Sequence, residues 1–249
     1  FLGTGGYHPN ERRHTSGVLL PEIGLLLDAG TGTFRAAERL TGDRLTIALT
    51  HAHLDHVCGL TYLLVPLHQG RIRQLRVLGA EPVLEAVRTQ LFSSRIFPVL
   101  PQAEFIPLRD GESWELAPGA TLSHLPLCCH PGGSQGFRVD WRDPQTQSPR
   151  SLAYITDTNV DGSYSAFIHG VDLLIHECFF PDGQSEWAEK TGHSCTSDVA
   201  RLARQAQVGR LLLTHIDPQL PDDDPIGLAV AQAIFPNVGL AEDLLEVML

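Results

Sequence analysis

The chain has 249 residues, of which 43% are hydrophobic and 19% are charged, so it holds enough apolar material for a large core. This composition excludes a disordered, collagen-like or coiled-coil protein. The formal net charge of −11 makes the surface as a whole repel phosphate backbones and anionic membranes. A nucleic-acid partner would therefore need a local basic patch.

The lengths of the apolar runs and the pattern of cysteines indicate in which cellular compartment to expect the protein. Every apolar run falls well short of the roughly 20 residues that a membrane span needs. The five cysteines include no C-x-x-C pair, and an odd number of scattered thiols favours a reducing compartment over a disulfide scaffold. We therefore expect a soluble, cytoplasmic protein. The residues before Phe1, and any targeting signal on them, stay open.

Alternating apolar patterns along the chain predict an α/β fold in which strands and helices are interspersed within one domain, residues 1–249. The predicted strands are 17–20, 25–28, 45–50, 76–79, 105–107, 114–116, 121–127, 137–141, 152–155, 173–176 and 211–214. The predicted helices are 34–40, 59–67, 82–92, 197–207 and 226–235. The polar segment 143–150 is typical of a surface loop rather than of an interdomain linker.

Residues 51–56 read His-Ala-His-Leu-Asp-His, which places four potential metal ligands within six positions at the end of a predicted strand. Side chains at i and i+2 of an extended segment point the same way, so His51 and His53 can clamp one ion. Asp55 and His56 then turn away on the following loop, which favours a second ion. Imidazole and carboxylate ligands without thiolate suit zinc first, with manganese or iron as alternatives.

Three further candidate ligands each follow an apolar strand: His130, Asp157 and His215. Strand ends of this kind gather at one edge of a sheet, so we expect these side chains to complete the metal site. A lone histidine is more often an ordinary core or surface group, and we interpret His68, His124, His169 and His176 in that way. The clustering of the other candidates argues against that interpretation for them.

These seven residues resemble the metallo-β-lactamase superfamily, and the resemblance covers essentially the whole chain. It implies a four-layer αββα sandwich with two metal ions at the sheet edges. By position, His51, His53 and His130 would bind the first ion, and Asp55, His56 and His215 the second. Asp157 would bridge the two ions together with a hydroxide. No cysteine stands among these positions, unlike in the lactamases proper, so penicillin hydrolysis is not expected.

Six shorter segments are similar to ribonuclease Z and its phosphodiesterase relatives. They are Leu2-Gly-Thr-Gly-Gly6, Leu27-Asp-Ala-Gly30, His176-Glu-Cys178, Gly192-His-Ser194, Leu213-Thr-His-Ile216 and Phe235-Pro-Asn237. The resemblance implies that His193 is the mobile proton donor of this branch, although Cys178 and Cys195 depart from its usual motifs. Without the resemblance, His193 would be interpreted as a loop histidine after a glycine.

Two departures argue against a tRNA 3′-processing enzyme. Asp157 follows His130 by 27 positions, which leaves no room for the long basic arm of ribonuclease Z. The residues after His215 read Ile-Asp-Pro-Gln-Leu, where ribonuclease Z usually has an Arg-Tyr pair. Together with the acidic charge, they favour a small phosphodiester, such as a cyclic nucleotide, a cyclic sugar phosphate or a nucleotide fragment, over folded RNA or DNA.

The expected reaction is phosphodiester hydrolysis by a hydroxide that two metal ions activate. Asp55 would orient that hydroxide or accept its proton, and protonated His193, held by Glu177, would donate to the leaving alkoxide. Alternatively, Glu177 fixes the tautomer of a ligand histidine. Arg12 and Arg13 belong either to a phosphate contact or to a charged surface hairpin, and the sequence does not decide between these roles.

Three alternatives stay open. The first is ribonuclease Z proper, a tRNA 3′-endonuclease. The second is a thioester or lactone hydrolase of the same fold, although only 34 residues follow His215, too few for the helical substrate domain usual in that class. The third is a non-catalytic module that binds metal. Assembly as a homodimer is expected only by analogy with relatives of this branch.

Overall fold

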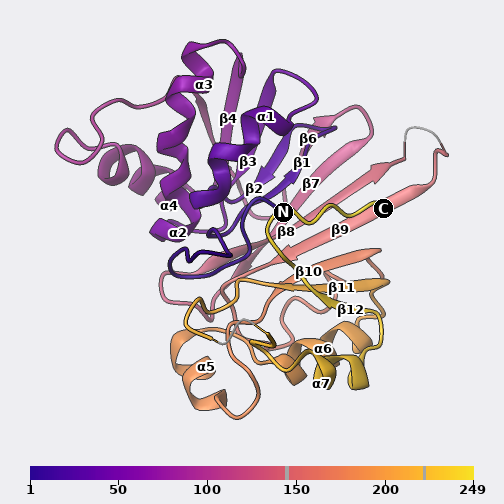
Figure 1. The fold of residues 1–249 in the computed structure, drawn as a ribbon. Helices are drawn as coiled ribbons and strands as arrows, with labels where there is room; N and C mark the ends of the chain where they lie inside the picture. Colours follow the sequence, from indigo (N-terminus) through magenta and orange to yellow (C-terminus); the bar gives the residue numbers. More distant parts are fainter. Residues whose placement is uncertain (144–145, 221–222) are drawn as a thin grey trace. The chain divides into compact units, whose positions relative to one another are not determined.

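The computed structural model describes residues 1–143, 146–220 and 223–249. It contains two compact units, Phe1–Arg109 and Asp110–Leu249. Each unit has its own β-sheet (Figure 1). The expectation of a single domain over residues 1–249 stays a prediction. Every helix in the described part of the chain is too short or too polar to cross a lipid bilayer.

The first unit contains a five-stranded sheet in the order β1-β2-β3-β4-β5. Its strands are β1 (Val18–Leu20), β2 (Leu25–Leu27), β3 (Arg44–Ala48), β4 (Gln74–Gly79) and β5 (Glu104–Pro107). β1 and β2 form the predicted antiparallel hairpin, and the remaining neighbours are parallel. Parallel strands need long crossover connections, and these carry the helical segments η1 (Thr31–Arg35), α1 (Ala36–Arg39), α2 (Leu54–Val57), η2 (Cys58–Leu63), α3 (Leu64–His68), α4 (Glu81–Ala86) and η3 (Val87–Leu91).

The second unit contains a seven-stranded mixed sheet in the order β12-β11-β10-β9-β8-β7-β6. Its strands are β6 (Ser113–Ala117), β7 (Ala120–Leu127), β8 (Ser134–Arg142), β9 (Pro149–Ile155), β10 (Leu173–Glu177), β11 (Arg210–Thr214) and β12 (Val238–Leu240). Pairing is antiparallel from β6 to β9 and parallel from β9 to β12. The helices are α5 (Ser185–Thr191), α6 (Thr196–Gln205) and α7 (Leu228–Ile234).

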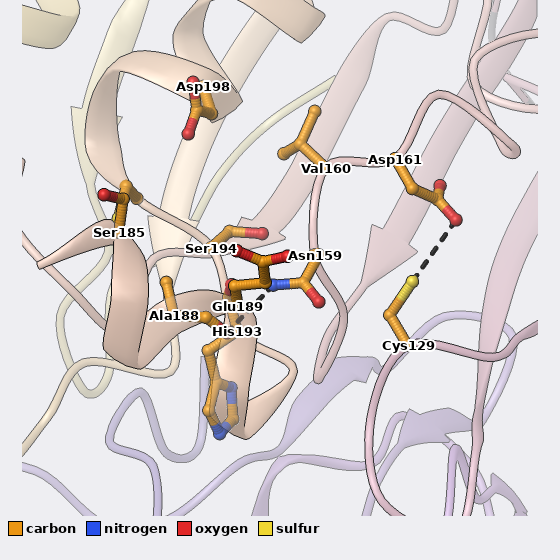
Figure 2. Close-up of a pocket in the computed structure, with 11 residues that line it drawn as sticks. Cys129, Asn159, Val160, Asp161, Ser185, Ala188, Glu189, His193, Ser194 and Asp198 are labelled. Atoms are coloured by element: carbon orange, nitrogen blue, oxygen red, sulfur yellow. Dashed lines mark hydrogen bonds between the residues drawn. The ribbon is translucent and has the colours of Figure 1, made fainter.

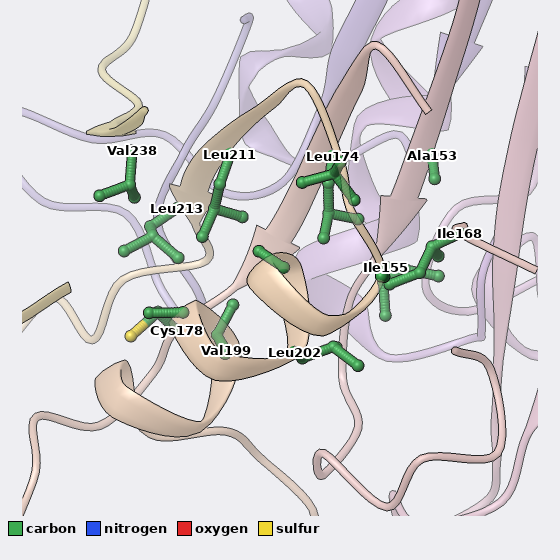
Figure 3. Packing of buried hydrophobic residues seen from close by; sticks show 14 of the residues in the cluster. Ala153, Ile155, Ile168, Leu174, Cys178, Val199, Leu202, Leu211, Leu213 and Val238 are labelled. Atoms are coloured by element: carbon green, nitrogen blue, oxygen red, sulfur yellow. The ribbon is translucent and has the colours of Figure 1, made fainter. Parts of the chain in front are cut away.

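The core of the second unit forms where α6 packs on the parallel strands (Figure 3). Leu174 of β10 and Leu213 of β11 share this cluster with Val199 and Leu202 of α6, and all four side chains are buried. Because successive strand residues point to opposite faces, Glu177 at the end of β10 points to the face opposite Leu174. Packing on one face of the sheet thus fixes the direction of a candidate catalytic side chain on the other.

The structure confirms the predicted strands and helices, with shifts of a few residues at their ends, and differs at four places. Residues 54–57 begin a helix, α2, instead of continuing as a loop. α5 and β12 were not predicted. The predicted surface loop 143–150 includes residues 144 and 145, which lie outside the described residues, and its last two residues belong to β9.

Candidate metal centre and proton donor

The four candidate ligands of the first unit lie just beyond β3. The chain bends at Thr50, His53 is extended, and α2 then carries Asp55 and His56. The ring of His51 lies 4.5 Å from the ring of His53 and 4.3 Å from that of His56, centroid to centroid. His56 Nε2 lies 3.3 Å from Asp55 Oδ2. The hexapeptide therefore forms one compact group of nitrogen and oxygen donors.

Asp28, which the sequence analysis named only within a motif, holds this group in place. Its fully buried carboxylate accepts hydrogen bonds from the backbone N–H of Thr50 at 2.8 Å and from the Thr50 hydroxyl at 3.0 Å. Oδ2 also lies 2.8 Å from Nδ1 of His56. Because an ionised carboxylate only accepts, Nδ1 of His56 carries the hydrogen. Nε2 is then the nitrogen that can bind a metal ion, an arrangement common around metal-binding histidines.

The glycine-rich N-terminal loop contacts the same group at Asp55. The backbone N–H of Tyr7 donates to Asp55 Oδ2 at 2.8 Å. Gly30 packs against the backbone of Asp55, since a Cβ at position 30 would lie 2.4 Å from the Asp55 carbonyl oxygen. No other residue type fits there without backbone movement. The loop and the close backbone packing thus fix where the Asp55 carboxylate stands.

The three strand-end candidates of the second unit come together. Asp157 Oδ2 lies 3.6 Å from His130 Nε2, and Asp157 Oδ1 lies 3.4 Å from His215 Nε2. The Thr156 hydroxyl donates to Oδ1 at 2.6 Å. All three candidate ligands are buried. One carboxylate oxygen therefore faces each imidazole, which is the arrangement that a carboxylate shared by two ions would need.

Three candidate site residues share an uncommon backbone conformation. Asp28 follows β2 with a φ of 59°, Asp157 follows β9 with a φ of 53°, and His215 follows β11 with a φ of 56°. Residues other than glycine rarely adopt this left-handed region, although aspartate and histidine are among those that do so most often. Local strain of this kind concentrates at functional sites. It turns each side chain sharply at the end of its strand.

His193 and Glu177 form a buried pair. His193 Nδ1 lies 3.1 Å from Glu177 Oε1 and 3.2 Å from Oε2. Glu177 also accepts backbone hydrogen bonds from Thr158 at 2.7 Å and from Ser194 at 3.3 Å, and it is fully buried. Since donors surround the carboxylate, it acts as an acceptor, and Nδ1 of His193 carries a hydrogen. Nε2 is then the position from which a second proton can be given away.

Aromatic packing orients the His193 ring. Phe179 stacks on it with the ring centroids 4.7 Å apart and an interplanar angle of 19°. His130 lies 4.9 Å away at 58°, and His215 lies 5.5 Å away at 26°. Asn159 donates to the carbonyl oxygens of His193 at 2.6 Å and of Ala188 at 2.9 Å. The proton-donor candidate thus lies beside two of the candidate ligands, with its ring plane and backbone both supported.

A pocket of about 380 Å³ lies beside this histidine in the second unit. Its walls include the carboxylates of Asp161, Glu189 and Asp198 as well as the hydroxyl groups of Ser185 and Ser194. Figure 2 shows the imidazole of His193 pointing away from Asp198 and Ser185, and the thiol of Cys129 hydrogen-bonded to Asp161. The charge of these walls disfavours a phosphate group, so we do not place the reacting phosphodiester in this pocket.

Two buried thiols near His193 have raised pKa values, which favours their protonated form. Burial, followed by the negative charges of Asp198 and Asp182, raises the pKa of Cys195 to about 11. Burial also raises the pKa of Cys178 far above its ordinary value. Because metals bind the thiolate, neither residue is a good ligand at neutral pH. This agrees with a donor set of imidazoles and carboxylates only.

Other histidines and arginines take structural roles. His176 is buried, with Nδ1 2.7 Å from the carbonyl oxygen of Glu177 and Nε2 2.8 Å from the Tyr164 hydroxyl. Burial lowers the pKa of His176, so it is neutral at neutral pH. Arg13 is also buried, and its guanidinium donates to the Thr4 hydroxyl at 2.7 Å. Arg12 is exposed. The loop that carries both arginines is therefore anchored from within by one of them.

The structure therefore assembles two donor sets, one in each unit. The first holds His51, His53, Asp55 and His56, and the second holds His130, Asp157 and His215. The donor chemistry of both sets, imidazole nitrogen and carboxylate oxygen, suits zinc or manganese. That the two sets hold a shared pair of ions stays a prediction. Asp28, Thr156, Asn159 and Phe179 are supporting residues that the sequence analysis did not assign.

The sequence and the fold of this chain are similar to those of several known proteins. Residues 24–216 match the family model described as a beta-lactamase superfamily domain. A ribonuclease Z from Saccharolobus islandicus is 30% identical over 294 aligned positions, which cover 98% of this chain and 96% of that protein. The metallo-beta-lactamase fold protein YhfI of Bacillus subtilis has a TM-score of 0.76 at 24% identity, covering 97% of this chain and 95% of that chain. The short form of human tRNase Z has a TM-score of 0.72 at 25% identity, covering 98% and 96%.

The chain belongs to the beta-lactamase superfamily, and it has the metallo-β-lactamase fold. Homologues with this fold are metal-dependent hydrolases, and this chain is a metal-dependent hydrolase. Within the superfamily it falls in the ribonuclease Z and phosphodiesterase branch. The fold class and the branch predicted from the sequence are confirmed, and family membership implies that the protein binds a divalent metal.

Proposed function

We propose that this protein is a phosphodiesterase that hydrolyses a small phosphodiester with two divalent metal ions, zinc in the first instance. The observation that carries the proposal is the carboxylate of Asp157 between His130 and His215, with the His193–Glu177 pair beside it. Seven residues would hold the ions: His51, His53, Asp55, His56, His130, Asp157 and His215. This set would combine a carboxylate shared by the two ions with a separate proton donor, two features that favour phosphodiester hydrolysis.

The residues of the chain have distinct tasks in this proposal. When bound, the two ions supply an activated water as nucleophile and stabilise negative charge on the phosphoryl oxygens. Asp55, which accepts a hydrogen bond from the backbone N–H of Tyr7, would orient that water or take its proton. Asp28 keeps His56 in one tautomer through the hydrogen bond at Nδ1. The nucleophile therefore needs no serine or cysteine side chain.

His193 completes the reaction by protonating the leaving alkoxide. Glu177 lies within hydrogen-bonding distance of its Nδ1 and orients the ring, so that Nε2 is left to face the leaving group. Proton donation from Nε2 then neutralises the alkoxide as the P–O bond breaks. A positioned acid of this kind contributes about 10²–10⁴-fold to the rate.

The short connection from His130 to Asp157 favours a small substrate. This stretch holds the antiparallel pair β8 and β9, and it carries no inserted arm in its described residues. The alignment to the Saccharolobus ribonuclease Z runs over 294 positions, whereas this chain has 249 residues, so that relative carries segments without a counterpart here. The net charge of −11 also disfavours a long polyanion.

A substrate screen with defined metal content tests the proposal. The protein, loaded with zinc or manganese, is incubated with bis-p-nitrophenyl phosphate, cyclic nucleotides, cyclic sugar phosphates, thioesters and lactones. We expect hydrolysis of the phosphodiesters and little turnover of the thioesters and lactones. Thioester or lactone hydrolysis without phosphodiesterase activity would reject the proposal in favour of that other chemistry.

Ribonuclease Z activity is the second candidate, and the similarity to the Saccharolobus enzyme over 96% of its length favours it. In that case the chain would cut a precursor tRNA next to its discriminator base. Incubation with a precursor tRNA that carries a 3′ trailer separates the two candidates. A small-substrate phosphodiesterase leaves this RNA intact or cuts it slowly at scattered positions.

A further inference from the structure

The N-terminal loop next to Asp55 is built as a rigid element. The backbone N–H groups of Thr4 and Gly5 both donate to the carbonyl oxygen of His14, at 2.9 and 2.8 Å. The Asn10 side chain accepts from the backbone N–H groups of Arg12 and Arg13 at 2.9 and 2.8 Å. These bonds close the loop on itself and support its tip from within.

Tyr7 occupies the tip of this loop under backbone strain. Its φ of 59° lies in the left-handed region, which a bulky residue rarely adopts. In this conformation its N–H donates to Asp55 Oδ2 at 2.8 Å, so the Cα of Tyr7 is held next to a candidate ligand. Glycine would fit the same backbone without strain. We therefore expect the side chain of Tyr7 to have a function that offsets this strain.

That side chain is largely in solvent. The exposed fraction of Tyr7 is 67%, and that of Leu54, the residue before Asp55 in the chain, is 69%. The ring of His8 meets the Tyr7 ring edge-on, with centroids 5.0 Å apart and an angle of 61°. Tyr7 and Leu54 thus expose large side chains although both residues are tied to Asp55, Tyr7 by its backbone hydrogen bond and Leu54 as its neighbour in the chain.

We propose that Tyr7 is a specificity-determining residue whose ring stacks on a planar aromatic group of the substrate, the base of a nucleotide. An aromatic face binds any nucleobase by stacking, with a contribution equal to about 5- to 150-fold in affinity. The hydrogen bond from the Tyr7 N–H to Asp55 Oδ2, at 2.8 Å, holds the backbone of Tyr7 beside a residue that would bind metal at the reacting phosphate. This inference rests on the proposed function, and it narrows the small phosphodiester to a nucleotide.

The test compares Tyr7→Ala and Tyr7→Phe with the wild-type protein on two matched substrates. One is a nucleoside cyclic phosphate, and the other is the same cyclic ribose phosphate with a methyl group in place of the base. For Tyr7→Ala we expect kcat/KM to fall about 5- to 150-fold on the substrate with a base and to change less than about 2-fold on the other. Tyr7→Phe should resemble the wild type on both. Equal losses on both substrates, or no loss on either, would overturn the inference.

Equilibrium binding gives a second readout that does not need turnover. The Kd of a nucleoside monophosphate and that of ribose phosphate are measured by calorimetry for the wild type and for both variants, with thermal unfolding as a check on folding. We expect only the nucleotide to bind more weakly to Tyr7→Ala. If the wild type hydrolyses neither cyclic phosphate, the proposed function fails, and this binding comparison still decides the role of Tyr7. Unchanged nucleotide affinity in Tyr7→Ala would reject it.

Discussion

The two units of this protein present their candidate ligands in opposite ways. In the first unit, His51 to His56 lie within one short stretch of sequence beyond β3. In the second, His130, Asp157 and His215 follow three different strands and meet only because β7, β9 and β11 belong to one sheet. The first set depends on local conformation, whereas the second depends on the packing of a whole sheet.

The units nevertheless support their histidines in the same way. Asp28 in the first unit and Glu177 in the second are both fully buried, and each accepts at least one backbone N–H. Each lies within hydrogen-bonding distance of Nδ1 of a histidine, His56 in one case and His193 in the other. The same device thus serves a candidate metal ligand in one unit and a candidate proton donor in the other.

The largest effect should follow from deleting one ligand in either unit. His51→Ala and His215→Ala should each lose bound metal, and the rate should fall about 10³-fold or more, because a metal ion stabilises the transition state by several kcal/mol. Metal analysis and phosphodiesterase assays measure both effects, and His169→Ala, an exposed histidine outside both sets, is the control. Full metal content and activity in either ligand variant would show that its unit does not contribute to the centre.

Replacing His193, the proposed proton donor, should lower the rate of the chemical step without loss of bound metal. In His193→Ala, kcat on a substrate with an alkoxide leaving group should fall about 10²–10⁴-fold, and the metal content should stay near that of the wild type. The fall should be much smaller with p-nitrophenolate, which leaves without protonation. If the loss is equal for both leaving groups, His193 does not donate the proton.

Substitutions of the two supporting carboxylates, Asp28 and Glu177, should have smaller effects, which differ between the two residues. Asp28→Asn should weaken metal affinity about 10–100-fold, since Asp28 orients a candidate ligand. Glu177→Gln should leave metal affinity nearly unchanged and should lower kcat, since Glu177 supports the candidate donor His193. Glu186→Gln, an exposed carboxylate, is the control. A weakened metal affinity in Glu177→Gln would favour the other role considered for this residue.

The two units also differ in how much of their candidate sites can be predicted from the sequence. The spacing of His51 to His56 and the apolar runs before Asp157 and His215 suffice to name the candidate ligands. Asp28 follows the apolar run Leu25–Leu27 and could have been found by the same strand-end rule. By contrast, the pairing of Glu177 with His193 joins residues from different elements, and only the fold brings them together.

The elements that were not predicted have weak local signals. In α5, Ala188 is the buried residue, and Trp187 is 57% exposed, so the helix has no apolar periodicity to detect. β12 has three residues and is a strand because it pairs with β11. The helix α2 has only four residues, Leu54–Val57, which are too few to show a helical period, and the sequence therefore did not distinguish it from the expected loop.

The smallest predicted effect concerns Phe179, whose ring stacks on that of His193 with the centroids 4.7 Å apart. Aromatic stacking contributes about 0.5–1.5 kcal/mol beyond the area buried, so Phe179→Leu should lower kcat about 2- to 10-fold by loosening the ring of the donor. Phe179→Tyr keeps the stacked ring and should restore the rate. As for His193→Ala, the loss should be confined to alkoxide leaving groups, and thermal unfolding reports any general damage. An equal loss with p-nitrophenolate would mean that Phe179 acts on the structure of the unit and not on the proton donor.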